Sequence, residues 1–113
     1  MTKTIPNILL IYTGGTIGMI KDPETGALRA FDFANLLDRI PELKLLECTI
    51  ETYSFEEPID SSNMEPKYWV QIAEVIQQNY PLFDGFVVLH GSDTMSYTAS
   101  ALSFMLEHLA KPV

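Results

Sequence analysis

Three short polar segments carry side chains that could act together in chemistry. They are "TGGTIG" at 13–18, "DSSN" at 60–63 and "HGSDT" at 90–94. Their hydroxyl groups belong to Thr13, Thr16, Ser61, Ser62, Ser92 and Thr94. A threonine hydroxyl set against glycine N–H groups can attack a carbonyl carbon while those donors hold the developing oxyanion. Carboxylates at Asp60 and Asp93 can hold an ammonium, so the whole set suits a small zwitterion.

Simpler interpretations of these segments stay open on the residues alone. Gly14 and Gly15 are compatible with a plain tight turn, and their surroundings match neither the dinucleotide fingerprint nor the P-loop. Asp93 or Thr94 could serve only to cap a following helix. Ser92 lacks the G-x-S-x-G context of a nucleophile elbow. Each segment by itself therefore leaves the chemistry undecided.

The histidines do not form the pattern of a metal site. A zinc-type site needs clustered His, Cys or carboxylate ligands, whereas His108 lies 18 residues beyond His90 on the next predicted helix. His90 is therefore interpreted as a structural residue. We expect no metal.

The polar segments need a scaffold that brings them to one edge. Apolar or branched residues at 8–12, 44–55 and 86–89 predict three strands that alternate with helices. Such alternation favours an α/β fold, a doubly wound and mainly parallel sheet with helices on both faces. In open parallel sheets ligands bind beyond the carboxyl ends of the strands, which is where all three polar segments fall.

Helix signals and turn signals lie between the strands. Ser62 and Glu65 have the spacing of a capping box, Pro66 suits a first helical turn, and Pro81 ends the pattern. A further short helix is predicted over 33–39, and turn residues within 19–31 predict a surface hairpin or flap. The helix after Asp93 carries one mainly apolar stripe: Thr98, Ala101, Leu102, Met105, Leu106 and Leu109.

Composition excludes several classes of partner. The 113 residues have a formal net charge of −8, whereas nucleic-acid binders present a basic face to phosphates. No apolar run approaches the roughly 18 residues that span a bilayer, and residues 1–7 lack the pattern of a secretory signal. The single Cys48 cannot form an intrachain disulfide. We therefore expect a cytoplasmic protein without nucleic-acid or membrane partners.

Taken together, the motifs resemble those of a known enzyme family. "TGGTIG" and "HGSDTMSYTASALSF" are similar to the two signature segments of bacterial-type L-asparaginases, and "PIDSSNM" resembles the substrate loop between them. The "DSS" triplet and the "YTASALSFMLE" helix look like the type I, cytoplasmic branch. The likeness runs along nearly the whole chain in consistent order. Chain order as well as motif content therefore supports the resemblance.

The resemblance implies hydrolysis of L-asparagine to L-aspartate and ammonia, with no metal or organic cofactor. Thr16 matches the threonine nucleophile that forms an acyl-enzyme. Ser92 and Asp93 match the threonine and aspartate of a second set that a lysine completes, with Asp93 also near the substrate ammonium. The substrate loop corresponds to Asp60, Ser61 and Ser62. Family members act as homodimers or homotetramers, so the same is expected of the full-length enzyme.

Three departures from the family pattern qualify this expectation. Ala27 stands where the flap tyrosine would align, and Ser92 replaces a threonine while keeping the hydroxyl. The family lysine lies beyond Val113, and "AKPV" ends where an apolar strand could begin. Residues 1–113 are thus expected to be the N-terminal portion of a single α/β asparaginase domain, incomplete at its C-terminal end and inactive alone.

Two other functions remain open on the sequence. One is a catalytically silent module that binds an amino acid, suggested by the missing flap tyrosine and lysine. The other is an amidohydrolase of the same fold that acts on glutamine or on the amide of an aminoacyl-tRNA. One methylene in a pocket is worth only about 1–3 kcal/mol, so residue patterns do not separate these substrates.

Overall fold

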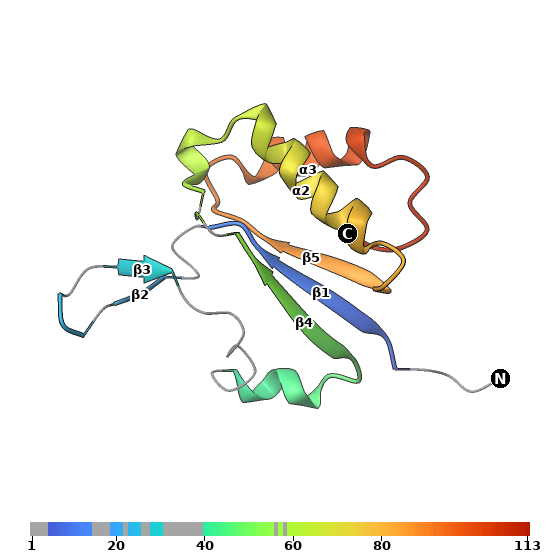
Figure 1. Cartoon of the computed structure of the whole chain (residues 1–113), viewed down its shortest axis with the longest axis horizontal. Coiled ribbons are helices and arrows are strands. Elements are labelled where there is room, and N and C mark those ends of the chain that lie inside the picture. Colours follow the sequence, from blue (N-terminus) through green and yellow to red (C-terminus); the bar gives the residue numbers. More distant parts are fainter. Residues whose placement is uncertain are drawn as a thin grey trace.

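The chain folds around a three-stranded parallel sheet. The computed structural model describes residues 5–14, 19–21, 23–25, 28–30, 40–55, 57 and 59–113. Strand β1 (Asn7–Tyr12) lies between β4 (Thr49–Ser54) and β5 (Gly85–Leu89), and both run parallel to it. Helices α2 (Pro66–Asn79) and α3 (Met95–Met105) lie on the same side of the sheet (Figure 1). The predicted parallel α/β fold is confirmed.

The strand register makes the three strands end at one edge. Tyr12 pairs with Ser54 on one side and with Leu89 on the other, so the loops that follow all leave from this edge. The middle strand of the prediction is shorter than expected, because residues Pro41–Leu45 form a 3-10 helix, η3. Pro41 lies in the first turn of η3, where its missing N–H removes no helical hydrogen bond.

Helix α2 begins and ends where prolines predict, but its start is built differently. Pro66 lies in the first turn and the helix ends at Asn79, shortly before Pro81. The capping-box prediction is wrong: Glu65 is the N-cap residue and makes no side-chain capping bond. Ser62 belongs instead to a separate 3-10 helix, η4 (Ser61–Asn63), whose N-cap is the preceding aspartate.

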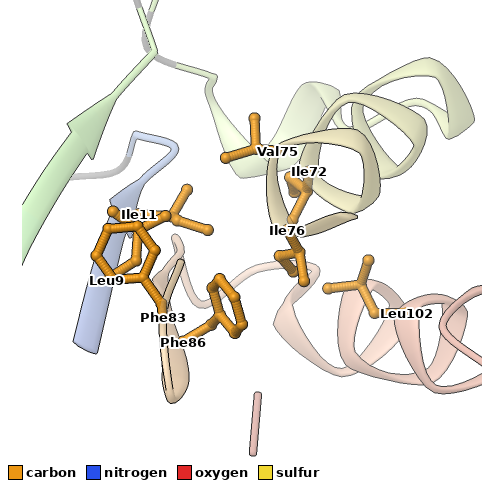
Figure 2. Packing of buried hydrophobic residues seen from close by; sticks show 8 residues of the cluster. All are labelled: Leu9, Ile11, Ile72, Val75, Ile76, Phe83, Phe86 and Leu102. Atoms are coloured by element: carbon orange, nitrogen blue, oxygen red, sulfur yellow. The ribbon is translucent and has the colours of Figure 1, made fainter. Parts of the chain in front are cut away.

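The main core lies between the sheet and both helices. Its buried members come from β1, β5, α2, α3 and the loop before β5, and Figure 2 shows them pointing toward one another: Leu9, Ile11, Ile72, Val75, Ile76, Phe83, Phe86 and Leu102. Burial of one such side chain contributes about 1.5–3 kcal/mol. This core holds the sheet and helices together, so it also holds the loops that connect them.

The other sheet face has a smaller apolar cluster around Tyr12. This residue is 1% exposed and packs against Leu10, Leu43 and Leu89, of which Leu43 comes from η3. Burial raises the pKa of the Tyr12 phenol, because the charged form loses solvation. The helix predicted over 33–39 lies outside the described residues. In the part of the chain that the structure describes, η3 is thus the helical segment that touches this face.

The flap predicted after the first strand is a hairpin. Strand β2 (Met19–Lys21) pairs antiparallel with β3 (Leu28–Ala30) in a two-stranded sheet of its own. Figure 1 shows this hairpin standing apart from the three-stranded sheet. Ala27, the position aligned with the family tyrosine, lies outside the described residues.

Two reciprocal hydrogen bonds connect the strands at the amino-terminal end of the sheet. The Asn7 N–H donates to Oδ2 of Asp84 (2.7 Å), and the Asp84 N–H donates to the Asn7 carbonyl oxygen (2.7 Å). These bonds connect the start of β1 to the turn before β5. They lie at the opposite end of the strands from the polar loops.

The last residues return to the sheet beside β5. The Phe86 N–H donates to the Pro112 carbonyl oxygen (3.0 Å), and the Ala110 N–H donates to the Tyr80 hydroxyl (2.7 Å). The ring of Tyr80 stacks on Phe86, with centroids 6.1 Å apart.

Among the described residues, no helix is long and apolar enough to cross a bilayer.

Candidate functional site

The polar segments leave the carboxyl edge of the sheet and are bonded to one another. We call residues 13–14, 59–63 and 90–94 the first, second and third rim loops. Thr13 is 1% exposed, and its Oγ1 donates to the Leu89 carbonyl oxygen (2.8 Å), as does its backbone N–H (3.2 Å). This hydroxyl, which the sequence placed in the chemical set, therefore holds the first rim loop to the end of β5.

Gly14 joins the first rim loop to the second. Its φ of +144° lies in a region that L side chains rarely adopt. A Cβ at this position would overlap the carbonyl oxygen of Ile59 and lie 2.5 Å from its nitrogen. The Ile59 N–H donates to the Thr13 carbonyl oxygen (2.7 Å) at the same crossing. Only a residue without a side chain fits here, which accounts for the first glycine of "TGGTIG".

Thr94 joins the second rim loop to the third. It is the N-cap residue of α3, but its side chain makes no capping bond. Its Oγ1 donates instead to the Ser61 carbonyl oxygen (2.7 Å), and Ser61 is 6% exposed. The alternative in which the Thr94 hydroxyl only caps the helix is therefore wrong. Bonds now connect all three rim loops.

The second rim loop presents an exposed aspartate whose carboxylate accepts two hydrogen bonds from Ser62. Oδ1 of Asp60 accepts from the Ser62 hydroxyl (2.8 Å) and from the Ser62 N–H (3.0 Å). Both bonds favour the carboxylate, so they lower the pKa of Asp60 below its ordinary value. Asp60 and Ser62 are exposed. An exposed carboxylate at the edge of a site is suited to an ammonium group.

The remaining predicted site residues lie on either side of these bonds. Ser92 and Asp93 are exposed in the third rim loop, directly before α3. Thr16 and its immediate neighbours lie outside the described residues. The contact between Ser61 and Thr94 therefore brings the predicted binding loop and the predicted Ser92–Asp93 loop together, and the place of Thr16 beside them stays a prediction.

A bonded series of side chains supports the third rim loop, and sequence reasoning did not find it. Trp69 Nε1 donates to Thr98 Oγ1 (2.9 Å), which lies 2.8 Å from His90 Nε2, and His90 Nδ1 lies 2.6 Å from the Gly91 carbonyl oxygen. The signal was a threonine on an otherwise apolar stripe of α3. A partly buried indole also needs an acceptor for its N–H. The structural interpretation of His90 agrees with these contacts.

Two hollows border the rim loops, and of the described predicted site residues only Asp60 lines one of them. A hollow of about 340 Å³ lies under α3 and is lined by His90, Thr98 and apolar side chains. Another of about 660 Å³ lies between β4 and α2 and is lined by Asp60, Asn63 and further polar side chains. Neither includes Ser92 or Asp93.

Within the described ranges, no three His, Cys or carboxylate side chains are placed to hold a metal ion.

Comparisons with known proteins identify the family to which the chain belongs. The family model for the asparaginase N-terminal region matches residues 7–113. The chain is 47% identical to L-asparaginase 1 of Escherichia coli over 111 residues, which are 95% of this chain and 32% of that protein. It is 43% identical over 111 residues to a glutamyl-tRNA(Gln) amidotransferase subunit of Pyrococcus horikoshii, covering 96% of this chain and 25% of that one.

A solved structure matches the fold as well as the sequence. The crystal structure of L-asparaginase I from Vibrio cholerae superposes with a TM-score of 0.84 and 44% identity, covering 97% of this chain and 32% of that one. The chain thus spans about a third of the length of these asparaginase relatives. By sequence and by fold, it belongs to the asparaginase family, and its residues 7–113 correspond to the N-terminal region of that family.

Proposed function

We propose that the whole protein hydrolyses the side-chain amide of L-asparagine to L-aspartate and ammonia. The observation that carries this proposal is the mutual bonding of the three rim loops at the carboxyl edge of the sheet. The bonds that hold these loops together run from Thr13 to Leu89, from Ile59 to Thr13 and from Thr94 to Ser61. Parallel sheets place ligands at this edge, and family membership supplies the reaction class.

In this proposal Thr16 is the nucleophile. Its hydroxyl oxygen bonds to the amide carbon and loses its proton, ammonia leaves with a proton gained at nitrogen, and an ester links the acyl group to Thr16. Water then attacks the ester, releases aspartate and restores the hydroxyl. Ser92 and Asp93, with a lysine from outside these 113 residues, form the second set that activates the attacking group. Backbone N–H groups near the glycines hold the oxyanion.

Substrate binding falls to the second and third rim loops. A serine hydroxyl and backbone groups of Ser61 and Ser62 hold the α-carboxylate, and Asp93 lies near the α-ammonium. The bonds from Ser62 lower the pKa of Asp60, and its exposed carboxylate adds to the attraction for the ammonium. The net charge of −8 does not oppose binding of a zwitterion, which carries no net charge itself.

The proposal also covers the setting of the reaction. Hydrolysis by a threonine and water requires no cofactor. The 113 residues are the N-terminal portion of a single α/β asparaginase domain, which needs its remainder for activity. The whole enzyme acts in the cytoplasm as a homodimer or homotetramer, without nucleic-acid or membrane partners.

Ammonia release tests this function. The whole protein should release ammonia from L-asparagine, Thr16→Ala should abolish release, and Thr16→Ser should retain a measurable rate because it keeps the hydroxyl. A silent binding module would instead bind asparagine in calorimetry without releasing ammonia, in both wild type and Thr16→Ala. Full turnover by Thr16→Ala would show that another group is the nucleophile.

A second candidate is hydrolysis of a different amide. It is favoured by the 43% identity to the Pyrococcus horikoshii amidotransferase protein, a level close to that of the asparaginase relatives. Rates on asparagine, glutamine and an aminoacyl-tRNA amide separate the two candidates. Asparaginase function requires that kcat/KM for asparagine exceed that for the other two amides.

A further inference from the structure

We propose that Thr98 is a positioning residue that sets the third rim loop through the His90 ring. This inference rests on the proposed function, because it assigns Thr98 a role in aiming Ser92 and Asp93. Thr98 lies on α3 and is 3% exposed, so its hydroxyl is sheltered from competing water. It touches side chains from two other parts of the fold, Trp69 of α2 and His90 after β5.

The donors and acceptors in this series allow only one arrangement for a neutral His90. The indole of Trp69 can only donate, so Thr98 Oγ1 accepts from it. The Gly91 carbonyl oxygen can only accept, and it lies 2.6 Å from His90 Nδ1, so the ring hydrogen must be on Nδ1. His90 Nε2 is then an acceptor, and Thr98 Oγ1 donates to it across 2.8 Å.

This arrangement transmits the position of two helices to the loop. Because Thr98 keeps Nε2 as the acceptor, Nδ1 keeps its hydrogen and holds the Gly91 carbonyl. The peptide that joins Gly91 to Ser92 is therefore fixed in direction, and Ser92 and Asp93 start from a defined place. Trp69 keeps the Thr98 hydroxyl turned toward His90, because it occupies a lone pair and leaves the hydrogen for the ring.

A matched set of variants of the whole protein separates positioning from simple packing. Thr98→Val keeps the shape and removes the hydroxyl, whereas Thr98→Ser keeps the hydroxyl and removes a methyl. We expect Thr98→Val to lower kcat for asparagine about 10- to 100-fold, as expected when a reacting group is misplaced by a fraction of an ångström to 1 Å. Thr98→Ser should recover most of the rate. The control is Ser103→Ala on the same helix. It removes the hydrogen bond from the exposed Ser103 hydroxyl to the Ser100 carbonyl oxygen, and it should leave kcat unchanged.

The second readout is the ring tautomer, which does not depend on activity. Nitrogen-15 NMR of the wild type should show His90 protonated at Nδ1 when neutral, and Thr98→Val should lose this single form. A wild-type ring protonated at Nε2 overturns the proposal, even where Thr98→Val does not fold. So does a Thr98→Val enzyme that keeps kcat within about twofold, assayed well below its unfolding temperature.

The two proposals fail in different ways. If wild type releases no ammonia from asparagine but shows the expected tautomer, asparaginase function is wrong and the bonded series is retained. If wild type is an active asparaginase and Thr98→Val matches it, the positioning role is wrong and the function is retained.

Discussion

Gly14→Ala tests the view that the rim loops depend on one close backbone crossing. Gly14 has a φ of +144°, and its Cα faces the backbone of Ile59. An added methyl would meet backbone atoms, which cannot rotate away as the end of a side chain can. The Ile59 N–H, bonded to the Thr13 carbonyl oxygen at 2.7 Å, would have to move with the loop.

The expected cost follows from two contributions. An alanine held at a φ that favours glycine costs about 1–3 kcal/mol. Ile59 is 7% exposed, so loss of the acceptor for its N–H costs roughly a further 1–3 kcal/mol. We therefore expect Gly14→Ala to lower the free energy of unfolding by about 3 kcal/mol or more, which is roughly a 100-fold change in the folding equilibrium.

Urea unfolding followed by circular dichroism measures this change, and Gly85→Ala is the matched control. Gly85 is also buried, but its added methyl would lie 3.1 Å from Cδ1 of Ile8 and 3.3 Å from Cγ of Pro112. Both distances exceed 3.0 Å, so these neighbours need to move by only a few tenths of an ångström, and the expected cost is only about 1 kcal/mol. Amide hydrogen exchange at Ile59 should become faster in Gly14→Ala and not in Gly85→Ala.

The reasoning would be refuted by equal stability losses in the two variants. It would also be refuted if Gly14→Ala kept the wild-type exchange protection at Ile59, since the methyl cannot fit without moving that N–H. A loss confined to Gly14→Ala, with unchanged denaturant slope, supports the crossing as a local feature of the native state.

Three further outcomes can be checked directly. Ser62→Ala should raise the pKa of Asp60 toward its ordinary value, which a carbon-13 NMR titration measures. In the wild type the bonds to Asp60 stabilise the fold at pH values above the ordinary pKa of the carboxyl. This stabilisation is lost as the pH falls through the lower pKa of the folded state. Ile76→Ala, at a position with 0% exposure, should lower the free energy of unfolding by about 2–5 kcal/mol in urea, and a loss below about 1 kcal/mol would contradict the described core. Asp84→Ala should lower it by about 1 kcal/mol, because Asn7 loses its acceptor, whereas Asp84→Asn should lose less.

Local patterns predicted the scaffold well because periodicity and proline are local signals. The apolar run at 8–12 became β1, and Pro66 and Pro81 bracket α2 as expected. The parallel order followed from the alternation of strands and helices. The turn residues near Pro23 also predicted the hairpin of β2 and β3.

Contacts between distant residues were harder to predict. Ser62 and Glu65 have the spacing of a capping box, yet the Ser62 hydroxyl donates to Asp60 and Glu65 is itself the N-cap residue of α2. Thr94 was predicted as one of the site hydroxyls or as a helix cap, whereas its hydroxyl donates to the carbonyl oxygen of Ser61, 33 residues away. Such choices depend on which acceptor the fold brings closest. No spacing rule encodes them.

The site itself was predicted as a group of loops more securely than as a set of roles. Chain order and strand direction placed the segments of Asp60 and Asp93 at one edge, and the structure joins those segments there. The series through Thr98 was missed because a threonine on an apolar stripe is typical of simple packing. The nucleophile assignment to Thr16 still rests on the resemblance.

The reciprocal bonds between Asn7 and Asp84 have a consequence for engineering. They lie one strand length from the rim loops, about 17 Å for the six residues of β1. Effects of substitutions so far apart, without shared partners, combine additively. Substitutions that raise thermal stability at the amino-terminal end of the sheet can therefore be combined with substitutions that change the amide substrate at the carboxyl edge. Their effects on the free energy of unfolding should add.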